Sequence, residues 1–252
     1  MNRTRRFALV GLISLAAIGS AQAWSWSFGN SQRVEGGGDL STEQRELSGF
    51  DAVSLAGSFK VQIRQGAADK VEVRADRNLL PYLETRVVEG KKGRTLEIST
   101  KKGYSISAKE TPLISLDMRQ LRGVAVAGSG EINVAPFKAE AVEASVAGSG
   151  DIRFADLQAQ RLGLSVAGSG DVAAAGRVAT LKVSVAGSGD VKARDLVSEE
   201  AKVSISGSGD VSVQALKKLQ VSIAGSGDVA YAGSPEISTS IAGSGAVRKI
   251  SP

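Results

Sequence analysis

The chain has 252 residues, no cysteine, no histidine, 4% aromatic residues and a formal net charge of +5. The absence of cysteine excludes disulfides, thiol chemistry and a lipobox, and the absence of histidine excludes His-dependent nucleophilic triads and the usual zinc sites. Stability must therefore come from packing, metal binding or assembly, and the few aromatic residues favour a thin core over an ordinary globular one.

Residues 1–23 are predicted to be an export signal. Arginines within residues 3–6 precede an apolar run over 7–19, and small residues at 21–23 suit a signal peptidase. The apolar run is too short to cross about 30 Å of hydrocarbon. We therefore expect a mature chain that starts near Trp24, has no transmembrane segment and is periplasmic, secreted or at the cell surface.

Removal of the signal also changes the charge balance. Three of the 31 basic residues and none of the 26 acidic ones leave with it, and 28 − 26 gives +2. The remaining basic residues are scattered among acidic ones, so nucleic acid is not an expected partner.

The next two segments lack the regular repeat that follows them. Residues 24–47, with Trp24, Trp26 and three consecutive glycines, are predicted to be a flexible leader. A solenoid domain is predicted over 48–250, and its part 48–120 is expected to form degenerate coils. The strands expected there are 71–74, 83–88, 95–99 and 113–118, with turns at 65–66, 89–90 and 102–103.

Residues 121–250 are predicted to form regular coils. Gly-Ser-Gly occurs seven times at spacings of 20, 20, 19, 20, 18 and 18 residues, and a fixed period near 20 indicates a repeat architecture. The columns two before and four after the first glycine contain only Val or Ile, while the column three before it is Ser in six copies. This alternation predicts a half-buried strand on each side of the turn, and stacking of the copies predicts an all-β, single-domain parallel β-solenoid with about 18–20 residues per coil.

The turn glycines have a structural explanation. A sharp corner requires positive φ, which costs about 1–2 kcal/mol for a residue with a Cβ and nothing for glycine. A phosphate-binding loop is disfavoured because such loops lead into a helix. A degenerate copy at 53–61 has Phe59 in place of the second glycine. The predicted structural turn residues are Gly128, Gly130, Gly148, Gly150, Gly168, Gly170, Gly187, Gly189, Gly207, Gly209, Gly225, Gly227, Gly243 and Gly245.

An acidic residue follows six of the seven turns. The stacked column is Glu131, Asp151, Asp171, Asp190, Asp210 and Asp228, and Ala246 ends it. Neighbouring charges about 5 Å apart in water repel by roughly 0.8 kcal/mol. The favoured interpretation is that each carboxylate accepts hydrogen bonds from N–H groups of its own turn, with no metal or cofactor bound. The alternative is a row of Ca²⁺ ions on Asp151, Asp171, Asp190, Asp210 and Asp228, although one Gly-Asp turn per coil supplies few ligands.

Aromatic side chains within the repeats could mark a sugar-binding face. Phe154 and Tyr231 share an inward-alternating column with Val and Ala, so a place in the core is the favoured interpretation for them, and Phe137 is the third such candidate.

The chain resembles the auto-transporter adhesins with a head GIN domain over about residues 46–248. The resemblance rests on Ser48-Gly49-Phe50-Asp51-Ala52-Val53, on residues 78–85, on Gly130-Glu131-Ile132-Asn133 and on the serial Gly-Ser-Gly-Asp turns. It implies a right-handed parallel β-helix similar to pectin lyases and a role in adhesion, and it brings no catalytic residues.

We expect a non-catalytic protein that binds a polysaccharide or protein of the cell surface or envelope. The alternatives are a polysaccharide-active enzyme with a pectin-lyase-like fold and a calcium-binding structural solenoid. Catalysis is disfavoured because a catalytic site should interrupt the repeat, whereas these coils are most regular where side chains would have to specialise.

Overall fold

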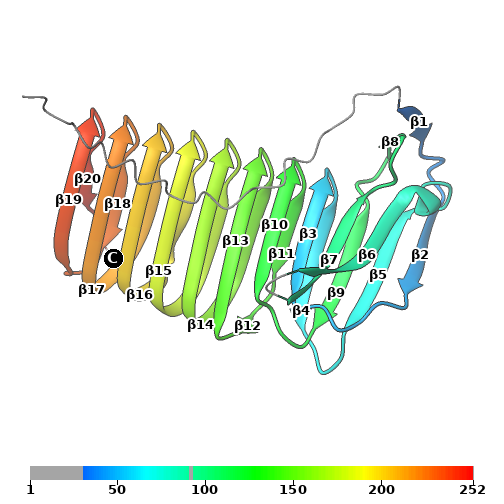
Figure 1. The fold of residues 1–252 in the computed structure, drawn as a ribbon, viewed down its shortest axis with the longest axis horizontal. Helices are drawn as coiled ribbons and strands as arrows, with labels where there is room; N and C mark the ends of the chain where they lie inside the picture. Colours follow the sequence, from blue (N-terminus) through cyan, green and yellow to red (C-terminus); the bar gives the residue numbers. More distant parts are fainter. Residues whose placement is uncertain (1–30, 91–92, 252) are drawn as a thin grey trace, which may run out of the picture. The chain divides into compact units, whose positions relative to one another are not determined.

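A computed structural model describes residues 31–90 and 93–251 (Figure 1). The predicted export signal and both tryptophans lie outside these residues. Within them, no helix is long and apolar enough to cross a membrane.

Parallel coils stack from β10 onward (Figure 1). Successive coils pair in register, with Gly128 beside Gly148 and Gly148 beside Gly168. The predicted all-β parallel solenoid is therefore confirmed. Its strands are β10 (Gly123–Gly128), β11 (Glu131–Val134), β12 (Phe137–Lys138), β13 (Ala141–Gly148), β14 (Asp151–Gly168), β15 (Val172–Gly187), β16 (Val191–Gly207), β17 (Val211–Gly225), β18 (Val229–Ala232), β19 (Glu236–Gly243) and β20 (Val247–Lys249).

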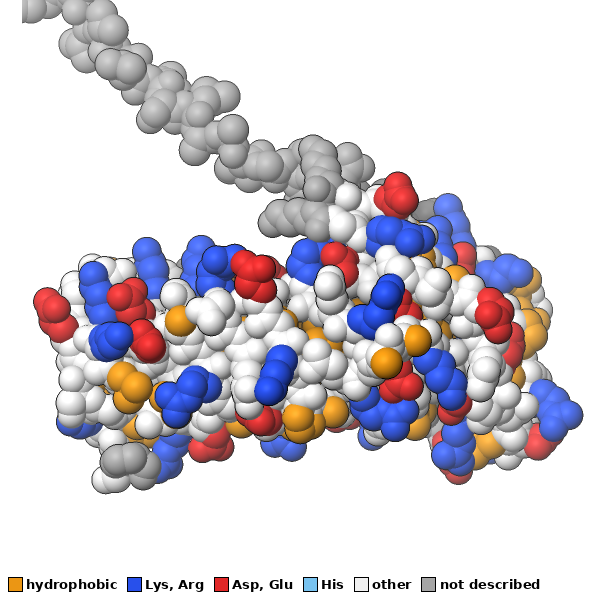
Figure 2. Space-filling model, turned by 90° about the horizontal axis from the view of Figure 1, so that it is seen from below, with side chains coloured by type: hydrophobic (Ala, Val, Ile, Leu, Met, Phe, Trp, Pro, Cys, Tyr) orange, Lys and Arg blue, Asp and Glu red, His pale blue; other side chains and the backbone are white. Residues whose placement is uncertain are grey.

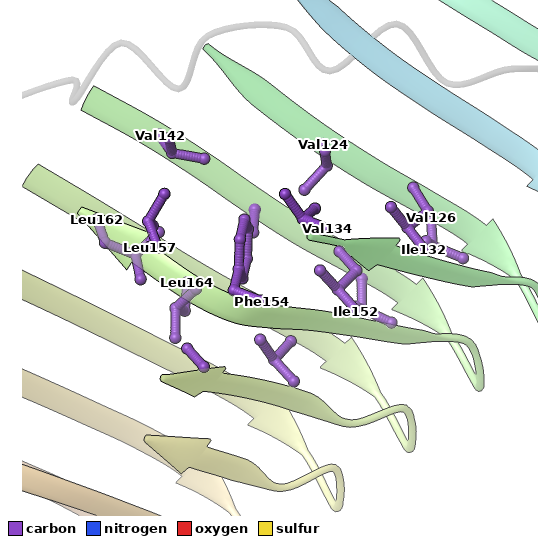
Figure 3. Packing of buried hydrophobic residues seen from close by; sticks show 14 of the residues in the cluster. Val124, Val126, Ile132, Val134, Val142, Ile152, Phe154, Leu157, Leu162 and Leu164 are labelled. Atoms are coloured by element: carbon purple, nitrogen blue, oxygen red, sulfur yellow. The ribbon is translucent and has the colours of Figure 1, made fainter. Parts of the chain in front are cut away.

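The two β-branched columns form the core. From Val126 to Ile223 the column before the turn is at most 3% exposed, and from Ile132 to Val229 the column after it is at most 2% exposed. Figure 3 shows members of both columns, such as Val126 and Ile132, pointing into the same interior. Phe137 and Phe154 are buried there too, and Tyr231 packs against the core. These aromatic residues are therefore core side chains and do not form an exposed sugar platform.

The first coil lies inside the stack and not at its end. It consists of β3 (Ala52–Gly57) and β4 (Lys60–Gln65), and β3 is flanked by β10 on one side and β7 on the other. Its register places Val53 beside Val124 and Val61 beside Ile132, as in the regular copies. Phe59 is buried at the position of the second turn glycine. The chain leaves this coil after β4, builds the end of the stack and returns to β10.

Antiparallel strands close that end, so residues 48–120 are not simply degenerate coils. The segment contains β5 (Lys70–Asp76), a short 3-10 helix (Leu80–Tyr82), β6 (Leu83–Gly90), β7 (Gly93–Thr100), β8 (Tyr104–Ser107) and β9 (Leu113–Met118). Here β5 is antiparallel to β9, and β6 is antiparallel to β7. The connection from β6 to β7 is short, and a short connection can join only antiparallel neighbours because parallel ones need a crossover.

The prediction of a flexible leader is wrong for residues 32–45. They form β1 (Gln32–Glu35), which pairs with β8, and β2 (Leu40–Arg45), which pairs with β5. Between these strands, the Gly38 N–H donates to Asp76 Oδ1 at 3.0 Å and the Gly37 N–H donates to Asn78 Oδ1 at 2.9 Å. A Cβ on Gly36 would collide with the Asp76 carboxylate. The glycines therefore let the backbone wrap closely around two polar side chains.

Candidate functional site

The Gly-Ser-Gly turns use their two glycines for different reasons. The first glycine of every turn has positive φ, from 114° at Gly128 to 138° at Gly207. The second glycine has no such φ. Instead, a Cβ there would press against the backbone of the preceding coil, as Gly209 would against the Gly189 carbonyl oxygen. The turns are therefore constrained both by corner geometry and by the close approach of the coils.

The carboxylate row consists of Glu131, Asp151, Asp171, Asp190, Asp210 and Asp228, and its aspartates bridge successive coils. Asp151 Oδ1 accepts the N–H of Asp171 at 3.1 Å, and Asp190 Oδ1 accepts that of Asp210 at 3.0 Å. The series continues from Asp171 to the Asp190 N–H, from Asp210 to the Asp228 N–H and from Asp228 to the Ala246 N–H, at 2.9 to 3.1 Å.

We expected each carboxylate to accept N–H groups of its own turn, but each aspartate accepts an N–H of the next coil instead. The regular backbone ladder between these coils begins at Ile152 beside Val172, one residue after the aspartates. The Asp171 N–H consequently has the Asp151 carboxylate as its acceptor at the step between coils. Each aspartate side chain thus accepts a backbone N–H of the next coil that the regular backbone ladder does not include.

The outward carboxylate oxygens meet basic side chains. Lys192 Nζ lies 3.0 Å from Asp171 Oδ2, and Arg248 lies 3.5 Å from Asp228 Oδ2. At the other end, Lys60 Nζ lies 3.7 Å from Glu131 Oε2. The hydrogen bond with Asp171, reinforced by its negative charge, raises the pKa of Lys192. These cations offset part of the repulsion along the row.

Sequence reasoning missed three basic residues beside the carboxylate row. Arg153, Lys192 and Arg248 all lie two residues after a member of the carboxylate row or after Ala246, and successive coils place them in one column. Period-two alternation points this column outward beside the acids, so the signal was present in the repeat.

A shallow hollow of about 180 Å³ lies along the last members of the row. Its lining combines three carboxylates with two cations and small residues, namely Asp190, Val191, Lys192, Asp210, Val211, Ser212, Asp228, Ala230 and Arg248. Across residues 31–90 and 93–251, no three side chains of His, Cys, Asp or Glu gather as a metal ion would require. The site presents carboxylates at the spacing of the coils, with Lys192 and Arg248 beside them.

The carboxylate row lies on the strands that follow the turns, and the strands that precede the turns form the other broad face. Its serine row, Ser145, Ser165, Ser184, Ser204, Ser222 and Ser240, is in register from coil to coil. Beside it runs a column of alanines interrupted only by Ser206, exposed throughout. Small side chains at about 4.8 Å spacing make the part of this face next to the turns flat and weakly polar.

The side of the stack opposite the turns carries charges of both signs. Figure 2 shows acidic and basic side chains interspersed along it. Some of them pair between coils, such as Lys217 with Glu199 at 2.8 Å. Their hydrogen bond, with the opposite charge, lowers the pKa of Glu199 and raises that of Lys217.

A second hollow, of about 360 Å³, lies where the first coil begins. Asp51 receives two hydrogen bonds from Arg122, at 3.0 and 3.2 Å, which join the start of β3 to β10. Asp69, whose side chain is 3% exposed, accepts the Gly49 N–H at 2.7 Å. The carboxylates near this hollow therefore have structural roles, which local sequence did not reveal.

These features define a class of protein, a β-solenoid in which each coil contributes one residue to every row of side chains on the broad faces. The family model described as "Putative auto-transporter adhesin, head GIN domain" matches residues 49–235, and the chain belongs to this family. Among curated proteins, none matches it.

Solved structures share the fold. A putative lipid binding protein from Parabacteroides distasonis is 34% identical, with a TM-score of 0.72 over 87% of this chain and 100% of the other. A putative adhesin from Bacteroides fragilis is 20% identical, with a TM-score of 0.78 over 86% and 100% of the two chains. A putative adhesin from Parabacteroides merdae is 21% identical, with a TM-score of 0.70 over 87% and 100%.

Substitutions at Asp190 distinguish a hydrogen-bonding role from calcium binding. Asp190→Asn keeps an acceptor oxygen for the Asp210 N–H and should change stability little, whereas Asp190→Ala should cost about 1 kcal/mol of unfolding free energy. Thermal melts of the wild type should be the same with EDTA and with millimolar Ca²⁺. A calcium-dependent rise in Tm that Asp190→Asn abolishes would instead assign the row to metal binding.

Proposed function

We propose that the protein is exported and is a non-catalytic binding protein that holds a polysaccharide of the cell envelope along the carboxylate row. The observation that carries this proposal is the row of outward carboxylate oxygens, which repeats at the spacing of the coils and has Lys192 and Arg248 beside it. Carboxylates accept hydrogen bonds from sugar hydroxyls, and ammonium and guanidinium groups donate to them.

A polymer suits this surface better than a small molecule does. The hollow is shallow and open along the stack, so no single point encloses a ligand. A chain with repeated hydroxyl groups can instead contact several coils at once, and linked weak contacts raise the overall affinity far above that of one contact.

The uniformity of the row supports binding without catalysis. Acid/base catalysis by two carboxylates requires environments that separate their pKa values. Here Asp151, Asp171 and Asp190 all have the same role, accepting the N–H of the next coil through Oδ1. The family and the solved relatives carry names of adhesins or binding proteins, in keeping with this proposal.

A glycan array probed with the purified mature protein tests the proposal. We expect polysaccharide hits whose binding falls about tenfold, or 1.4 kcal/mol, in the double variant Asp190→Asn, Asp210→Asn, because amides keep the ladder and remove the charges. The matched control is Ser184→Asn, Ser204→Asn on the serine row, which should bind like the wild type.

Three outcomes contradict the proposal. Equal loss in the two double variants would show that the carboxylate row is not the binding surface. Release of product from a bound polysaccharide would show an enzyme. Binding to lipid vesicles with no response on the array would assign a lipid ligand, as the name of the 34% identical relative suggests for that protein.

A further inference from the structure

The last coil leaves its inward residues uncovered. Ile205 and Ile223 are 3% and 2% exposed, whereas Ile241, the next member of the same column, is 43% exposed. Ile237 is 39% exposed, while Leu219 beside it is fully buried. Within the described residues β19 pairs only with β17, so its outer backbone edge is unpaired, and it forms one end of the stack in Figure 1.

This edge lacks the protection that exposed edge strands usually have. Lysine, other charges and proline normally prevent association at an unpaired edge. The strand begins with Glu236, directly after Pro235, but from Ile237 to Gly243 it contains none of these. At the opposite end of the stack, β2 carries Glu43 and Arg45, and β6 carries Glu84, Arg86 and Glu89. The uncharged stretch from Ile237 to Gly243 is therefore specific to the edge strand at this end of the stack.

Ala246 ends the series of side-chain hydrogen bonds between coils. In the coils from Asp151 to Asp228 an aspartate at this position accepts an N–H from the next parallel coil. Ala246 has no oxygen for that purpose, so a further parallel coil would lack the hydrogen bond that joins the coils from Asp151 to Ala246. The alternative for an unpaired strand is an antiparallel neighbour, and two copies related by a two-fold axis provide one.

We propose that β19 is a homodimer interface in which two copies pair antiparallel about a two-fold axis at Thr239. This register places Ile237 opposite Ile241 of the second copy, on the core side, and Ser238 opposite its Ser240, on the outer side. A slip by one residue would set isoleucine against serine. No like charges meet between Ile237 and Gly243, so the strand is complementary to itself in both pattern and charge.

The mass of the mature protein in solution tests this proposal. Light scattering after size exclusion should give a dimer for the wild type and a monomer for Ile241→Lys, which places a charge in the interface. Because Ile241 is already 43% exposed, this variant should stay folded, as a thermal melt will show. The matched control is Ser165→Lys, an exposed change in the middle of the stack, which should remain dimeric.

A single introduced cysteine tests the register independently. The chain has no cysteine, so any disulfide must join the introduced residues of two copies. Residues directly opposite in an antiparallel pair have Cβ atoms about 4.5–5.5 Å apart, near enough for a disulfide after small shifts. Thr239→Cys should give about tenfold more covalent dimer than Ser165→Cys because pairing raises the effective thiol concentration.

A monomeric wild type with no excess crosslinking of Thr239→Cys would overturn the proposal. So would a dimer that Ile241→Lys leaves intact, or open-ended oligomers, which would indicate head-to-tail stacking. A monomer in which another protein or a further segment of chain covers β19 would assign the edge to a different occupant and would also overturn it.

Discussion

Replacing Val185 with aspartate should unfold the protein. Val185 is 1% exposed and lies between Val166 and Ile205 in the inward column. An unpaired carboxylate there would be desolvated at a cost of several kcal/mol, comparable with the 5–15 kcal/mol by which domains are usually stable. Circular dichroism at room temperature should show loss of the β signal, or a melt shifted far below that of the wild type.

The neighbouring residue provides the control. Ser184 points outward in the same strand and is half-exposed, so Ser184→Asp should shift Tm by only a few degrees. Each variant adds one carboxylate, and the two positions are adjacent in the chain. The difference in Tm between the variants therefore reports only which side of the strand faces the core. Equal melts would mean that the inward and outward columns have been exchanged.

The regular coils could be predicted because each copy repeats the same constraint. Seven turns with β-branched residues at fixed offsets leave one consistent arrangement, and the register of Gly128 with Gly148 follows from it. In the segment before them, predicted strands such as 71–74 and 113–118 coincide with β5 and β9. Their antiparallel pairing was not predictable, because alternation identifies a strand and its buried face but does not give the direction of its neighbour.

The closing end was missed because its stabilising contacts are remote in sequence. Gly37 and Gly38 bond to Asn78 and Asp76, about forty residues away. Three glycines with no apolar period predict flexibility when read locally. Only the folded chain shows that they surround a fully buried carboxylate, Asp76. Tertiary contact overrides local composition here.

The sequence predicts that the carboxylates form a column, but it does not predict which N–H groups they accept. Stacking identifies which residues are neighbours, and so places Asp190 beside Asp210. Whether the amide donor belongs to the same turn or to the next coil depends on the residue at which the backbone ladder begins, which is Val191 beside Val211 in these coils. A shift of one residue in that starting point changes the donor, and the residue types do not show where the backbone ladder begins.

Gly207→Ala should cost about 3–5 kcal/mol of unfolding free energy, more than the usual effect of a point mutation. Two penalties combine at this position. Its φ of 138° disfavours any residue with a Cβ, and that Cβ would also collide with the carbonyl oxygen of Gly187. The same oxygen accepts the Ser208 N–H at 2.8 Å, so moving the strands apart to relieve the collision would break an inter-coil hydrogen bond.

Two further alanine variants separate these penalties. Gly103 has a φ of 88°, and a Cβ added there would meet nothing within 4 Å, so Gly103→Ala should report the backbone cost alone, about 1–2 kcal/mol. Gly209→Ala, without positive φ, should report the collision with the preceding coil alone. Urea unfolding of the three variants measures each cost. If Gly207→Ala were no more destabilising than Gly103→Ala, the close approach of the coils would not be what requires glycine at this turn.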